Sequence, residues 1–151
     1  ADAAGSWPSL MASPWVSFLL VAGAGSASAE VGAPCLGCVH HGEVDEHVVS
    51  AARNGVGALN AELKGPEPAL GLVKVHEVKK QVVSGMKYEL LLEAAETSCS
   101  VEAVRSTETP AEDCARREGS ASKFYAMHIV DAPWRSPRYT ILSKKPVTPP
   151  A

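Results

Sequence analysis

Cys35, Cys38, His40 and His41 lie close together in the stretch CLGCVHH. Thiolates and imidazoles are the ligands that zinc prefers, so this grouping is compatible with a metal site. Structural zinc sites usually draw their second ligand pair from a more distant part of the chain, and two adjacent histidines rarely reach one ion. Metal binding and thiol–disulfide exchange by the C-x-x-C pair are therefore secondary hypotheses. No metal and no other cofactor is predicted.

The rest of the sequence carries none of the motifs that mark common catalytic sites. There is no G-x-S-x-G, no P-loop, no H-E-x-x-H and no pair of carboxylates on a recognisable scaffold. Charged residues make up 21% of the chain, the net charge is −3, and no basic block interrupts this balance, which argues against a nucleic-acid partner. We therefore expect a protein that is not an enzyme and does not bind nucleic acid.

The N-terminal residues have the pattern of a secretory signal peptide. Residues 3–29 contain no charged side chain, and an apolar run over 15–22 leads to the A-x-A sequence of Ala27–Ala29. That run is well short of the ~20 residues that a membrane-spanning helix requires. We therefore predict a pre-sequence and signal peptide over residues 1–29, a secreted, extracellular protein, and no membrane association of the mature form.

Secretion makes the cysteines candidates for disulfide bonds. The chain has four, and they fall in two groups, Cys35 with Cys38 and Cys99 with Cys114. Four cysteines allow three pairings, and the sequence does not decide between them. The first two could pair with each other, stay free or link two chains.

Hydrophobic residues at helical spacing predict one amphipathic helix over residues 45–63. Asp45 is placed to cap its first turn, and Gly65 and Pro66 are expected to stop it. The residues of the predicted apolar face are Val48, Ala52, Val56, Leu59 and Leu63.

Four strands are predicted after the helix, because β-branched and aromatic residues recur there at a two-residue step. The predicted strands span residues 72–83, 86–94, 123–131 and 138–143, with a long surface segment over 96–122. Met86, Tyr88, Leu90 and Leu92 share one face of the second strand and should face the helix. One helix packed across one curved antiparallel sheet is the economical arrangement, an α+β fold of two layers.

Two predicted hairpin tips carry apolar residues where tips are usually polar. The first is Gln81–Gly85, which reads QVVSG, and the second contains Pro133 and Trp134. An exposed Trp is costly unless a partner covers it. In an antiparallel meander both tips lie at the same end of the sheet, and an extended arm before the helix could bring Leu36 and Gly37 to the same edge. These segments predict a narrow apolar wedge that enters a cleft in another protein.

The wedge resembles that of the cystatins, protein inhibitors of papain-like cysteine proteases. Their signature is a glycine in the N-terminal arm, a Q-x-V-x-G first hairpin loop and a Pro-Trp second loop. Gly37, Gln81–Gly85 and Pro133-Trp134 match it, with Gly42 as a competing arm glycine. The resemblance covers roughly residues 35–145. It implies a cystatin-like fold and reversible, tight-binding competitive inhibition of proteases of the cathepsin L, cathepsin B and papain type.

The resemblance also implies roles for individual residues. Leu36 would fill an apolar pocket on the non-primed side of the protease cleft, and Gly37 would let the arm bend away before it is cut. Gln81 is expected to hold the first loop by hydrogen bonds to that loop's own backbone. The residues implied to bind protease are Leu36, Gly37, Gln81, Val82, Val83, Ser84, Gly85, Pro133 and Trp134.

The sequence departs from the cystatin pattern in its cysteines. Secreted members usually carry two disulfides after the first hairpin, and Cys99 and Cys114 match the first of them. Tyr125 stands where the third cysteine would fall, so the second bridge is absent. Two alternatives therefore stay open: a cystatin-fold binding or antimicrobial module without inhibition and, less favoured, a small Cys/His metal-binding protein. Exchange of the first hairpin could also produce a domain-swapped dimer.

The predicted organisation is a pre-sequence and signal peptide at residues 1–29, a cystatin domain at 30–145 and a Pro-rich C-terminal tail at 146–151.

Overall fold

The structure, a computed structural model, describes residues 35–106 and 111–151. The signal peptide predicted at residues 1–29 lies outside the described residues. In the described part of the chain, no helix is both long enough and apolar enough to cross a membrane.

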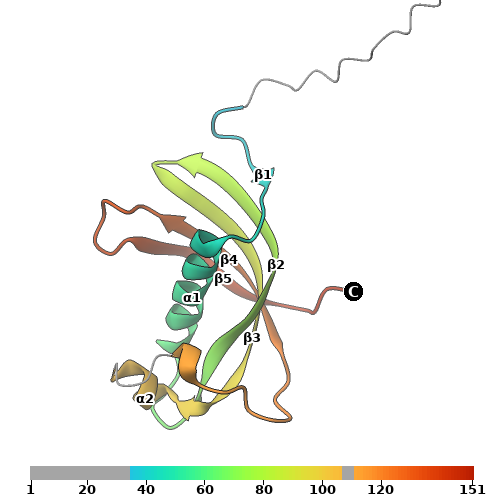
Figure 1. The fold of residues 1–151 in the computed structure, drawn as a ribbon, viewed down its shortest axis with the longest axis vertical. Helices are drawn as coiled ribbons and strands as arrows, with labels where there is room; N and C mark the ends of the chain where they lie inside the picture. Colours follow the sequence, from blue (N-terminus) through green and yellow to red (C-terminus); the bar gives the residue numbers. More distant parts are fainter. Residues whose placement is uncertain (1–34, 107–110) are drawn as a thin grey trace, which may run out of the picture. The chain divides into compact units, whose positions relative to one another are not determined.

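The described residues form an antiparallel sheet of five strands, in the order β1-β2-β3-β4-β5, with the helix α1 packed on it (Figure 1). This arrangement confirms the predicted α+β fold, one main helix on an antiparallel sheet. The strands are β1 (His40–His41), β2 (Pro68–Val83), β3 (Gly85–Ser100), β4 (Lys123–Asp131) and β5 (Tyr139–Val147). The helices are α1 (Glu46–Asn60), the short α2 (Val101–Arg105) and the 3-10 helix η1 (Ala111–Asp113).

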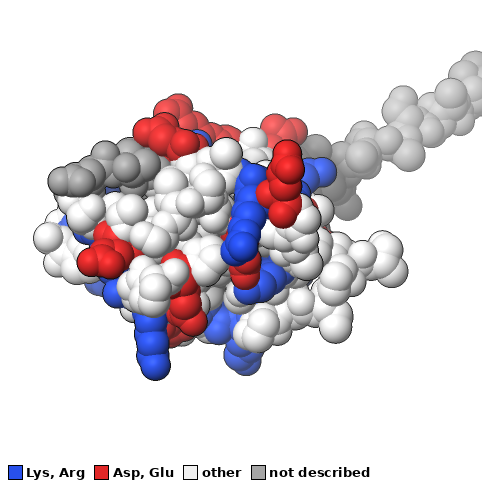
Figure 2. Space-filling view, turned by 90° about the horizontal axis from the view of Figure 1, so that it is seen from below, with Lys and Arg blue, Asp and Glu red and all other residues white. Residues whose placement is uncertain are grey.

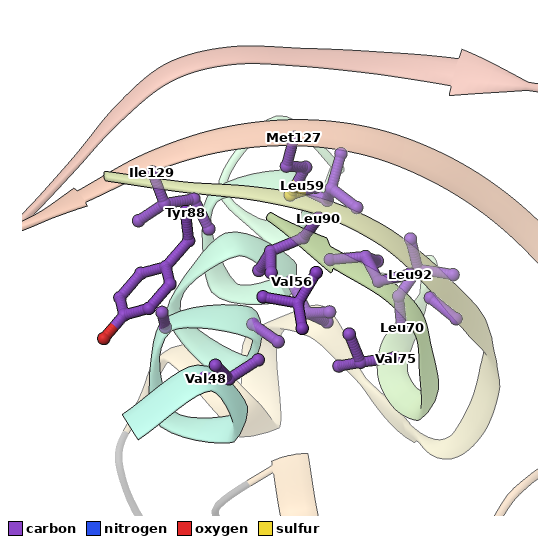
Figure 3. Packing of buried hydrophobic residues seen from close by; sticks show 14 residues of the cluster. Val48, Val56, Leu59, Leu70, Val75, Tyr88, Leu90, Leu92, Met127 and Ile129 are labelled. Carbon is purple, nitrogen blue, oxygen red and sulfur yellow. The ribbon is translucent and has the colours of Figure 1, made fainter. Parts of the chain in front are cut away.

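The hydrophobic core lies between α1 and strands β2, β3 and β4. Leu92, Met127 and Ile129 on the sheet and Val48 on the helix are fully buried, and the Tyr88 ring lies at one end of the cluster (Figure 3). The predicted inward face of β3 is therefore confirmed. Its fourth member, Met86, is partly buried against the same cluster.

The helix α1 ends earlier than predicted, at Asn60 instead of Leu63. Two polar side chains account for this. The Asn60 amide donates to the Leu70 carbonyl at 2.9 Å and accepts from the Leu70 N–H at 2.7 Å. The Arg105 guanidinium donates to the carbonyls of Asn60, Ala61 and Leu63 at 2.7–2.9 Å. The Arg105 contacts satisfy carbonyls at the end of the helix, and the Asn60 contacts tie its last residue to β2.

The first hairpin is longer than predicted at its open end. β2 begins at Pro68 and β3 runs to Ser100, so the prediction of a surface segment from residue 96 was wrong. Thr97, which reads as a surface residue, is 4% exposed, and its hydroxyl donates to the Ala69 carbonyl at 2.8 Å. Val101, the first residue of α2, is fully buried.

The outer strands also differ from the prediction. β1 was not predicted, and it pairs with β2 through His40 opposite Lys80 and His41 opposite Lys79. β5 extends to Val147, where the prediction ended at residue 143. Pro146 pairs with Tyr125 and lies in β5, an edge strand of the sheet, which is where strand prolines are usually found.

Asp45 caps α1 and gives a testable pH dependence. Its carboxylate accepts from the Val48 N–H at 2.9 Å and from Lys80 Nζ at 2.6 Å. The hydrogen bond from Lys80 is the larger cause, and the bond from the Val48 N–H the next, of a pKa of Asp45 that lies below its ordinary value of 3.8. Because the pKa of Asp45 is lower in the folded protein than in the unfolded chain, its contribution to stability is fully present at pH values above the unfolded-state pKa. This contribution is lost as the pH falls through the folded-state pKa.

We expect Asp45→Ala to lower the free energy of unfolding by about 1 kcal/mol at neutral pH, the usual worth of an N-cap. Urea denaturation followed by circular dichroism measures it. The deficit should shrink in acid, once the wild-type carboxylate is protonated. Asp45→Asn keeps a cap acceptor and should lose less than the alanine variant. An alanine deficit that does not change between neutral and strongly acidic pH would contradict a role for the charge.

Candidate functional site

The tip of the first hairpin is a very tight turn. Val83 pairs with Gly85, and only Ser84 lies between them. Gly85 has φ +109°, a conformation that favours glycine. A Cβ at this position would overlap the carbonyl oxygen of Asp131, at the end of β4. Glycine is therefore required here for two reasons, and its absent side chain lets the first tip lie directly against the start of the second loop.

The second loop is held at its base by an ion pair. Asp131 is 5% exposed and accepts from Arg138 Nε at 2.6 Å and from a second guanidinium nitrogen at 2.9 Å. The hydrogen bond to Asp131 raises the pKa of Arg138, which stays charged. The backbone adds a bond from the Ala132 N–H to the Arg138 carbonyl at 2.9 Å. Trp134, in the loop that these contacts close, is 67% exposed. Neither charged residue was among the predicted site residues, although both flank the Pro-Trp loop.

The arm reaches the same end of the sheet through Gln81. Its side-chain amide donates to the Gly37 carbonyl at 2.8 Å, so the expectation that Gln81 bonds to its own loop was wrong. Leu36, next to Gly37, is 93% exposed. The competing arm glycine, Gly42, instead donates its N–H to the Val78 carbonyl, further along β2.

The two hairpin tips and the arm thus meet at one end of the sheet (Figure 1). A hollow of about 490 Å³ lies between the tips and is lined by residues of both, including Val83 and Trp134. Tyr88 also lines it, and burial raises its pKa, so the phenol stays neutral. Together the exposed apolar side chains at this end form what we term the apolar edge: Leu36, Val82, Val83 and Trp134.

The apolar edge projects from the protein and is distinct from the larger cavity elsewhere. A cavity of about 730 Å³ lies beside α1, β2 and η1, and none of the residues predicted to bind protease lines it. On the face drawn in Figure 2, Lys and Arg side chains are interspersed with Asp and Glu, without a broad area of one sign. The exposed side chains of the apolar edge are apolar, and an exposed apolar patch of this kind marks a surface that binds another protein.

The first four residues of the C-x-x-C-x-H-H stretch form a closed ring, and its two histidines form β1. A disulfide joins Cys35 to Cys38, so neither sulfur is a free thiolate. A second disulfide joins Cys99 to Cys114. Within residues 35–106 and 111–151, no three His, Cys, Asp or Glu side chains are grouped as a metal site would need.

One comparison with known proteins shows a family. A sequence profile described as the cystatin domain matches residues 37–127, which is more than half of the chain. No curated protein sequence matches the chain.

Solved structures share the fold at low identity. A salivary cystatin from the soft tick Ornithodoros moubata is 22% identical with a TM-score of 0.61, covering 76% of this chain and 100% of that one. Dimeric human cystatin F is 17% identical with a TM-score of 0.65, covering 80% and 95%. Mialostatin, a gut cystatin from the hard tick Ixodes ricinus, is 19% identical with a TM-score of 0.60, covering 75% and 100%.

Proposed function

Because this chain belongs to the cystatin family, whose members are cysteine protease inhibitors and not enzymes, we propose that it is a reversible, tight-binding competitive inhibitor of papain-like cysteine proteases. Proteases of the cathepsin L, cathepsin B and papain type are the proposed targets. The observation that carries the proposal is the apolar edge, where three segments far apart in the sequence present exposed apolar side chains side by side.

Inhibition of this kind needs no reaction with the catalytic cysteine. The protein fills the cleft and denies it to substrate, with Val82, Val83 and Trp134 supplying apolar contact area and Leu36 a further anchor. The sheet and the ion pair below the second loop fix the edge before binding. Little conformational entropy is then lost on association, which favours a tight complex.

Active-site titration tests the proposal. Purified protein is added in steps to papain and to a cathepsin L-like enzyme of known active-site concentration, and residual activity is followed with a fluorogenic peptide. We expect activity to fall linearly to an equivalence point and to return on dilution. If about micromolar protein leaves both enzymes fully active, the inhibitor proposal fails and a binding or antimicrobial module becomes the better account.

The bond between Gln81 and Gly37 gives a second test. Gln81→Ala removes the donor that ties the arm to the first hairpin, and a neutral hydrogen bond is worth about 0.5–1.5 kcal/mol. We expect the inhibition constant to rise by roughly 2- to 10-fold, as measured by progress-curve kinetics. Gln81→Asn, whose shorter amide falls short of the carbonyl, should behave like the alanine variant. Equal inhibition constants for all three proteins would show that the tie does not matter.

We also propose secretion, which both disulfides favour because they persist in oxidising compartments. The N-terminus of the secreted form, read by mass spectrometry, should lie near Glu30.

A domain-swapped dimer is a second proposed state. Exchange of the first hairpin would straighten the turn between Val83 and Gly85, so we expect a dimer isolated by gel filtration not to inhibit.

A further inference from the structure

The segment from Cys35 to Cys38 is a covalently closed turn at the apolar edge. The Cys38 N–H donates to the Cys35 carbonyl at 3.2 Å, the bond that defines a β-turn. Gly37 occupies the third position with φ +87°, as type II turns require. Leu36, at the second position, is the corner of the turn and is 93% exposed. The disulfide between the first and last residues turns this β-turn into a ring.

The ring cannot become extended. Its end Cα atoms are 5.4 Å apart, whereas three residue steps of extended chain span about 10 Å. A disulfide holds its two Cα atoms within roughly 7 Å, so this limit applies in every conformation of the ring. A protease cleft must hold a peptide in extended form on both sides of the bond that it cuts. The three peptide bonds inside the ring therefore cannot be presented as substrate.

The ring is also fixed in place at the edge. Gln81 donates to the Gly37 carbonyl in the ring, and β1, which begins two residues after Cys38, pairs with β2. An exposed leucine on an open arm would have to be ordered on binding, at a cost of about 1–2 kcal/mol for each backbone residue fixed.

We propose that the Cys35–Cys38 ring presents Leu36 to the protease as a preformed apolar knob that cannot be cleaved, and that opening the ring turns the arm into a substrate. This inference rests on the proposed inhibition of papain-like proteases. Cys35 and Cys38 act as positioning residues, since they work through Leu36. Gly37 then serves the closed turn, and not only a bend that leads the arm away from the cleft.

Papain tests the proposal with three proteins: wild type, the double variant Cys35→Ser/Cys38→Ser, and Leu36→Ala with the ring intact. The protease is activated with a thiol reductant that is then removed by gel filtration, so that the ring of the inhibitor stays closed. Each protein is incubated with papain for hours, its mass and cleavage sites are read by mass spectrometry, and its inhibition constant is measured. Circular dichroism checks that all three fold alike.

We expect wild type and Leu36→Ala to stay intact, and the double serine variant to be cut between residues 35 and 38. We expect the inhibition constant of the double serine variant to rise about tenfold or more, and that of Leu36→Ala to rise as well. A double serine variant that stays intact and inhibits like wild type would overturn the ring proposal alone. Cutting of the wild-type ring would also overturn it. Wild type that leaves papain fully active would overturn the proposed function instead.

Discussion

Trp134→Ala is expected to raise the inhibition constant for papain about 30-fold, which corresponds to the ~2 kcal/mol that an interface Trp anchor typically contributes. Trp134 is 67% exposed and stands in a loop closed by the Asp131–Arg138 pair, so its side chain is available to a partner and its loop is already held in place. Most of the loss should appear as faster dissociation, because mutations within one interface act mainly on the off-rate. Surface plasmon resonance on inactivated papain separates the two rates.

Two variants control for a general effect of removing a large exposed side chain. Leu142→Ala removes an apolar side chain that is 56% exposed on β5, outside the apolar edge, and should leave the inhibition constant unchanged. Trp134→Phe keeps an aromatic ring and should lose less than alanine. The melting temperature should change little in any of the three. An unchanged constant for Trp134→Ala would mean that the second loop does not touch the protease.

The helix and the core strands could be predicted from the sequence because their signal is local. The spacing of Val48, Ala52 and Val56 already identifies the buried face of α1, and all three are buried in the structure. The alternation that includes Tyr88 and Leu92 does the same for β3. Periodicity of this kind depends only on neighbours along the chain, and packing did not override it.

Other features could not be predicted because they depend on contacts between distant residues. Thr97 is buried only because its hydroxyl finds the Ala69 carbonyl across the hairpin. Gln81 bonds to Gly37, 44 residues away, and not to its own loop. The ring at Cys35–Cys38 was one of several states that cysteine spacing allows. At the apolar edge the sequence therefore predicted which apolar residues are exposed, while the contacts that hold them were visible only in three dimensions.

Gly85→Ala should have the second large effect, through the geometry of the apolar edge and not through loss of a contact group. An alanine at φ +109° costs about 1–2 kcal/mol of backbone strain, and its Cβ would overlap the Asp131 carbonyl oxygen. The overlap can be relieved only if the first tip moves away from the second loop. The distance between Val83 and Trp134 would then no longer be fixed, and we expect the inhibition constant to rise more than tenfold.

Gly119→Ala separates the backbone strain from the displacement of the tips. Gly119 also has a positive φ, +74°, but a Cβ there meets nothing within 4 Å, and the residue lies outside the apolar edge. Both variants should therefore have a lower free energy of unfolding, measured by urea denaturation, and the decrease should be larger for Gly85→Ala. Only Gly85→Ala should bind papain less tightly. Domains of this size usually have a free energy of unfolding of about 5–15 kcal/mol, so both variants should remain folded in the inhibition assay. If Gly85→Ala inhibits as well as Gly119→Ala, contact between the two tips is not what shapes the apolar edge for its partner.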